Sequence, residues 1–163
     1  MSTIAELIHE MIDHFAHDPG RINHFLKVYG FAKAIGEAEG LDQHTQDILE
    51  MAALTHDIGI KLSESKYGNA AGHYQEIEGP PEAEKMLVGL GVDSARIDRV
   101  CWLIAHHHTY GDIRDMDHQI LVEADFLVNI YEGDMSTESI RSIHDKVFKT
   151  PSGKKILTAM YLF

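Results

Sequence analysis

Histidine and aspartate occur at positions of the sequence that should otherwise be apolar. His24 lies four residues before Val28, so the two share one face of a helix. His56 lies four residues after Ala52 and also faces inward. Asp125 occupies an inward position in the apolar segment LVEADFLVNI. Because a buried carboxylate is costly unless it is paired, hydrogen-bonded or bound to a metal, these positions indicate a cation site.

Two more polar residues join this group. Asp57 directly follows His56, about 100° further round the helix, and at a helix end both side chains can turn toward one ion. His107 lies three residues after Ile104 and seven after Val100, so it projects from the same apolar stripe. Two imidazoles with two carboxylates suit Mn²⁺, Fe²⁺, Co²⁺, Ni²⁺ or Zn²⁺. One divalent transition metal is expected, and a second ion is left open.

Each of these residues, taken alone, also fits a structural role. A single inward histidine is more often a core or interface residue, and Asp57 and Asp125 could be a helix-end residue and a buried hydrogen-bond acceptor. The run His106–His108 could be a frayed helix end, where the helix dipole favours histidine. Six other histidines are expected to be solvated on the surface: His9, His14, His17, His44, His118 and His144.

The elements that must position these side chains are helical nearly throughout. Thr3 with Glu6 predicts a capping box, Gly40 a helix end and Asp93 a helix start. No stretch alternates with the period of a strand, so the fold is predicted to be all-α. Residues 59–81, rich in glycine and ending in a proline pair, are predicted to be irregular and to border the active-site mouth. Helices are expected near residues 4–15, 21–39, 42–57, 80–91, 93–108, 120–131, 137–148 and 152–162.

Composition limits the classes of partner and compartment. The chain has 163 residues and a net charge of −12, which fits one domain over residues 1–163 and disfavours nucleic-acid polymers and anionic membrane surfaces. The first residues lack the basic start of a signal peptide, and no apolar run is long enough to span a bilayer. The single cysteine excludes an internal disulfide. A cytoplasmic protein is therefore expected.

The order of the candidate ligands resembles that of the HD-domain superfamily of metal-dependent phosphohydrolases. The matching segments are HFLKVYGFA around His24, AALTHDIGIK around His56 and Asp57, and LVEADFLVNI around Asp125. The resemblance covers about residues 20–131. It implies that these four residues bind the metal.

The segment IAHHH also resembles the Ile-x-x-His-His segment of many members, which places His107 at the first histidine of that pair. The resemblance implies a single helical bundle with a five-helix metal-binding core, an N-terminal helix and C-terminal helices at about residues 137–162.

One stretch departs from the family pattern. Members with two metals often carry a histidine shortly before the glycine that opens the fourth helix, whereas Gln75 and Glu76 stand there in this chain and His73 comes earlier. A second metal or the substrate could be bound by members of a wider set. That candidate set is His107, His108, Glu76 and His73.

The resemblance also suggests catalytic roles. Asp57, His107 and Lys61 are the candidate catalytic residues, and His107 is expected to act as an acid or phosphate donor rather than as a ligand of a second ion. Lys61, or Arg21 or Lys66, could offset the negative charge of a phosphate ester.

The activity implied by the resemblance is hydrolysis of a phosphate ester by metal-activated water. The substrate would be a nucleotide or another small phosphorylated metabolite, and the choice between phosphomonoesterase and phosphodiesterase stays open. Two alternatives remain: a di-iron HD-type oxygenase on a small organic substrate, and a non-catalytic metal- or nucleotide-binding module. The amphipathic N-terminal helix could also pair copies of the chain as a homo-oligomer.

Overall fold

The computed structural model describes residues 2–163, and over this range the chain forms nine helices and no strand, which confirms the all-α prediction. No helix within these residues combines the length and the apolar character needed to cross a membrane. The helices are α1 (Thr3–His14), α2 (Pro19–Ala38), α3 (Gln43–Thr55), α4 (Ile60–Tyr67), α5 (Gly72–Gly89), α6 (Ser94–His106), α7 (Met116–Glu132), α8 (Thr137–Lys146) and α9 (Pro151–Tyr161).

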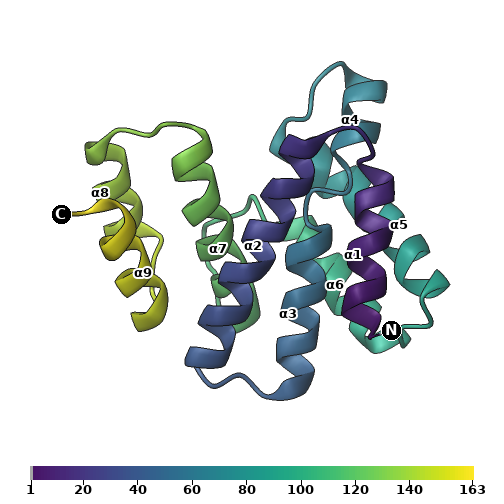
Figure 1. The fold of residues 1–163 in the computed structure, drawn as a ribbon, viewed down its shortest axis with the longest axis horizontal. Coiled ribbons are helices and arrows are strands. Elements are labelled where there is room, and N and C mark those ends of the chain that lie inside the picture. Colours follow the sequence, from purple (N-terminus) through teal and green to yellow (C-terminus); the bar gives the residue numbers. More distant parts are fainter. Residues whose placement is uncertain (1) are drawn as a thin grey trace.

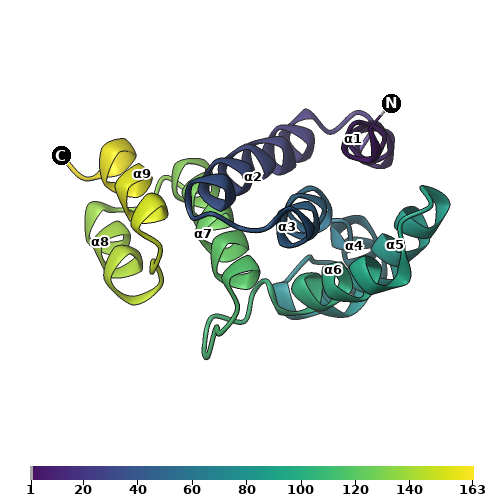
Figure 2. The ribbon, with the colours of Figure 1, turned by 90° about the horizontal axis from the view of Figure 1, so that it is seen from below.

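The helices α2, α3 and α7 form the middle of the molecule (Figures 1 and 2). Helix α6 packs on α3 and on α5, and α1 contacts both α3 and α5. The short helices α8 and α9 stand on the side of α7 away from α1 (Figure 1). This arrangement brings the C-terminal ends of α3 and α6 close to the first turns of α2 and to the second half of α7.

The helix starts follow the local sequence closely. The side chains of Asp42 and Asp93 accept hydrogen bonds from backbone amides of the first turns of α3 and α6, as expected for N-caps. At the start of α1 the cap is Ser2, which accepts from the amide of Ala5, so the predicted capping box at Thr3 is wrong by one residue.

The prediction that residues 59–81 are irregular is wrong, because most of the stretch lies in α4 and α5. Pro80 and Pro81 lie inside α5 rather than at its start. The glycines allow close packing instead of marking a loop: a Cβ on Gly59 would lie 2.6 Å from the backbone nitrogen of Gly79. The backbone that follows the end of α3 therefore rests directly on the middle of α5.

A buried carboxylate of α7 is one of the groups that hold the C-terminal helix pair to the core. Glu123 of α7 is fully buried and accepts hydrogen bonds from the hydroxyl of Thr150 at 2.6 Å and from the amides of Lys149 and Thr150, both at 3.2 Å. These donors form the start of α9. The expected helices near the C-terminus are present, and Pro151 is the first residue of α9.

Candidate metal centre

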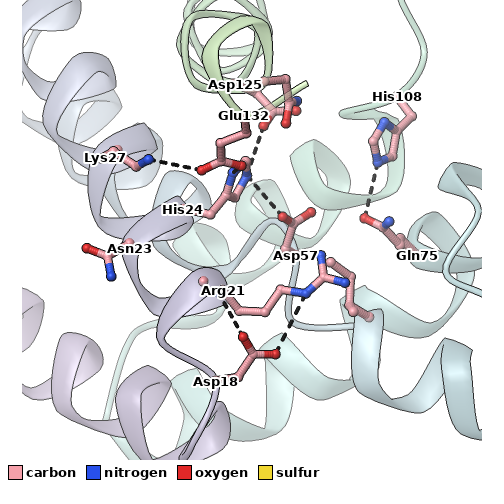
Figure 3. Close-up of a pocket in the computed structure, with 13 residues that line it drawn as sticks. Asp18, Arg21, Asn23, His24, Lys27, Asp57, Gln75, His108, Asp125 and Glu132 are labelled. Carbon is pink, nitrogen blue, oxygen red and sulfur yellow. Dashed lines mark hydrogen bonds and ion pairs between the residues drawn. The ribbon is translucent and has the colours of Figure 1, made fainter. Parts of the chain in front are cut away.

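The residues predicted to bind metal lie together in the structure, and Figure 3 shows three of them, His24, Asp57 and Asp125. His24 comes from α2, His56 is the C-cap of α3, Asp57 follows it, and Asp125 comes from α7; all four are buried. The Nε2 atoms of the two histidines are 3.3 Å apart. Oδ2 of Asp57 lies 3.1 Å and 3.3 Å from these nitrogens, and Oδ1 of Asp125 lies 3.2 Å and 3.3 Å from them.

These separations fit the donor atoms of a single cation. With metal–ligand bonds of about 2.1 Å, neighbouring donors stand about 3.0 Å apart in an octahedron and about 3.4 Å apart in a tetrahedron. The five separations between a histidine nitrogen and another donor atom, 3.1 to 3.3 Å, fall inside that range, and His24, His56 and Asp57 by themselves form a group whose donor atoms all lie close enough to hold a metal. Oδ1 of Asp125 is also buried without a hydrogen-bond partner, so the donor set fits a divalent metal.

Hydrogen bonds at the other ring nitrogens turn both histidines toward the centre. Nδ1–H of His56 donates to the carbonyl of Ala53 at 2.7 Å, and Nδ1–H of His24 donates to Oε2 of Glu132 at 2.8 Å. Because a carbonyl and a carboxylate only accept, Nε2 of each ring is left for the centre. Glu132 also pairs with the ammonium of Lys27 at 3.1 Å.

Without a cation, the imidazoles of this cluster hold protons. Burial lowers the pKa of His24, but its hydrogen bonds with Asp125 and Asp57 outweigh burial and raise that pKa to about 9. Burial likewise opposes the charge of His56, yet the two carboxylates raise its pKa well above the usual value. Burial raises the pKa values of the Asp57 and Asp125 carboxyls, but the neighbouring histidines lower them by a larger amount. Both carboxylates therefore stay ionised. A cation would therefore displace protons from the rings.

His107 lies beside this cluster at the C-cap of α6 and is 1% exposed. Its Nδ1–H donates to the carbonyl of Ile104 at 2.6 Å, and its Nε2 is buried without a hydrogen-bond partner, 3.7 Å from Oδ1 of Asp57. The ring meets that of His56 edge to face. The structure thus brings His107 to the centre, with its acceptor nitrogen pointing at Asp57.

His108 lies next to Gln75 rather than at the four-residue cluster. Its Nε2 is 3.1 Å from Oε1 of Gln75 (Figure 3). Burial and the neighbouring His107 lower the pKa of His108 to about 4. Asp57, His107 and His108 nevertheless form a second group whose donor atoms lie close enough to hold a metal.

Glu76 and His73 are not brought to the centre as ligands. Oε1 of Glu76 accepts from the amide of His108 and from the hydroxyl of Thr109, both at 3.0 Å, so this carboxylate ties α5 to the end of α6. His73 is exposed, and its ring lies against Tyr74.

The basic residues divide into those at the centre and those away from it. The ammonium of Lys61 donates to the carbonyl of His14 at 2.9 Å on the exposed face of α4, so the structure does not bring this candidate catalytic residue to the ligands. Lys66 pairs with a carboxylate of α5. Arg21 and Lys27 of α2 do line the cavity above His24.

The family comparison agrees with this geometry. The family model for the HD domain matches residues 21–146, which include all four clustered ligands. The chain belongs to the HD domain family. Members of the HD family are mostly metal-dependent phosphohydrolases. The match runs beyond the resemblance seen at residues 20–131 and takes in α8. No curated protein and no solved structure matches the chain.

A cavity of about 480 Å³ opens above the metal centre of this HD domain (Figure 3). His24, Asp57 and Asp125 form part of its wall, and Glu132 and Asn129 of α7 complete one side. Sequence reasoning missed Glu132 and Asn129. Both could have been found from helical spacing, because they follow Asp125 by seven and four residues and therefore share its face.

Most histidines outside the HD centre lie where they were expected. His9, His17 and His44 are exposed, and His14 and His144 are partly exposed. The prediction for His118 is wrong: it is 3% exposed, its Nε2 bonds the carbonyl of His106 at 3.0 Å, and burial lowers its pKa.

Proposed function

We propose that this HD domain is a metal-dependent phosphohydrolase acting on a nucleotide or another small phosphorylated metabolite. The observation that carries the proposal is the convergence of His24, His56, Asp57 and Asp125, all but His56 at the wall of an open cavity. A bound divalent cation would act there as a Lewis acid on a phosphoryl oxygen and make a water molecule nucleophilic near neutral pH.

The residues of the chain itself would bind and orient the substrate. Arg21 and Lys27 stand on the same face of α2 as His24, three residues before and after it, and both reach the cavity. The guanidinium of Arg21 is 4.0 Å from the carboxylate of Asp18 and 3.3 Å from that of Glu64. Both ion pairs are long and exposed, so Arg21 can leave them to bind a phosphate oxygen. These cations would offset the charge of the ester and fix its orientation.

His107 is the group best placed to move a proton. Because its Nδ1–H is committed to Ile104, its Nε2 is an acceptor beside Asp57. This geometry supports a role as proton acceptor from a group bound at Asp57, in place of the donor role expected from the sequence.

The test is hydrolysis by purified, tag-free protein supplied with Mn²⁺ and a panel of nucleotides, sugar phosphates and an aryl phosphate. Phosphate release should depend on the added metal, and Asp57→Ala should abolish metal binding and phosphate release together. Lys61→Met is the matched control, because Lys61 lies outside the cavity, and it should retain the activity.

Two results would contradict the proposal. Protein that binds Mn²⁺ but hydrolyses no member of the panel would favour the non-catalytic binding module. Purified protein that carries paired irons and absorbs visible light would favour the oxygenase alternative.

A further inference from the structure

The carboxylate of Asp57 faces two groups of nitrogen atoms at once. Its Oδ2 belongs to the cluster with His24 and His56, while its Oδ1 lies 3.7 Å from the unpartnered Nε2 of His107. A cation on the Oδ1 side would also need His108, the third member of the second potential ligand group. The position of His108 therefore decides whether that side can be filled.

The first turns of α5 hold the His108 ring in place. Gly72, Gln75 and Glu76 follow the i, i+3, i+4 spacing and face the end of α6 together. A Cβ on Gly72 would lie 2.8 Å from Cγ of His108, so only glycine lets the ring rest there. Glu76 accepts from the His108 amide at 3.0 Å, and Gln75 contacts the ring nitrogen at 3.1 Å.

The direction of the hydrogen bond from His108 to Gln75 follows from a third partner. The side-chain amide nitrogen of Gln75 donates to the carbonyl of Ala70 at 2.6 Å, which leaves Oε1 facing the ring. Since Oε1 only accepts, Nε2 of His108 must carry the hydrogen. Coordination through Nε2 would need the lone pair of that nitrogen, whereas in this arrangement the lone pair is on Nδ1, 3.3 Å from the hydroxyl of Tyr110, which can donate to it.

We propose that Gln75 restricts the metal centre to one cation, because its hydrogen bond withholds Nε2 of His108 from a second ion. Gln75 is thus a positioning residue that sets metal stoichiometry. The inference concerns the number of ions bound, so it stands or falls independently of the phosphohydrolase activity.

The test compares metal content in tag-free wild-type protein and three variants after equilibration with Mn²⁺ and removal of free ion. Gln75→His replaces the amide with a ligand, and Gln75→Met removes the amide while keeping a side chain of similar length. Ile77→His is the matched control, because residue 77 is 61% exposed on the same helix and a histidine there would face solvent.

Wild-type protein and Ile77→His should each bind about one ion per chain, and Gln75→His about two. The electron paramagnetic resonance spectrum of Mn²⁺ should be that of an isolated ion in the first two proteins and of a coupled pair in Gln75→His. Wild-type protein with two ions, or Gln75→His with one ion and an intact fold, would overturn the proposal.

Nitrogen-15 NMR of the metal-free wild type gives a check that does not require any variant to fold. His108 should be neutral with its hydrogen on Nε2, and this preference should be lost in Gln75→Met. A wild-type His108 with its hydrogen on Nδ1 would refute the proposed mechanism.

Discussion

Glu132 offers a sharp test of how the centre is organised, because it acts on the metal only through His24. Its Oε2 accepts the Nδ1–H of His24 at 2.8 Å, which fixes the ring with Nε2 facing the other ligands. Removal of a carboxylate that hydrogen-bonds a metal-ligating histidine typically weakens metal affinity by about 10- to 100-fold, or about 1.4 to 2.7 kcal/mol. The side chain of Glu132 is 35% exposed and also pairs with Lys27, so the loss of metal affinity on removing it should lie near the lower end of that range.

We therefore expect Glu132→Ala to weaken Mn²⁺ binding about 10-fold and Glu132→Gln, which keeps an acceptor oxygen, to weaken it less. Competition with a chelating dye measures both dissociation constants. Glu138→Ala, on the exposed start of α8, is the control and should bind as the wild type does. An unchanged dissociation constant in Glu132→Ala would refute the argument that this hydrogen bond orients His24.

Four further results are expected. Because the pKa of His24 is about 9 in the metal-free fold, Mn²⁺ binding near pH 7 should release protons and weaken as the pH falls, which calorimetry in buffers of different ionisation enthalpy detects. The same raised pKa stabilises the metal-free protein below about pH 6.5, and this contribution is lost as the pH rises through about 9 in urea unfolding. His107→Ala should keep its metal and lower kcat by about 10²-fold in the phosphate-release assay. Glu123→Ala should lower the free energy of unfolding in urea by about 2–4 kcal/mol without changing metal content, because it leaves the donors of Thr150 unpaired.

Helical periodicity in the sequence was sufficient to select polar residues on apolar faces that cluster in the structure. His24 and Asp125 are such cases, and the structure places both in the cluster. The same periodicity predicted that His107 faces the core, and in the structure His107 lies beside the cluster. Periodicity identifies such residues because a charged side chain on the buried face of a helix needs a partner. This requirement holds whichever other helices supply that partner.

Features that depend on contacts between distant segments could not be predicted in this way. Gly59 and Gly79 suggested a loop. In the structure they instead allow close packing of two backbone segments that lie twenty residues apart in the sequence. The hydrogen bond between Gln75 and His108 also joins separate helices. The sequence pattern therefore drew attention to Gln75 but could not predict that His108 is its partner. Lys61 was assigned by its nearness to Asp57 in the sequence, but α4 turns its side chain toward α1.

The most direct test of the metal centre is a crystal structure of Mn²⁺-soaked protein with anomalous diffraction measured at the manganese edge. The strongest anomalous peak should lie about 2.0–2.3 Å from Nε2 of His24, Nε2 of His56, Oδ2 of Asp57 and Oδ1 of Asp125. A strongest peak elsewhere, or crystals in which these four atoms stand apart, would contradict the assignment of this site.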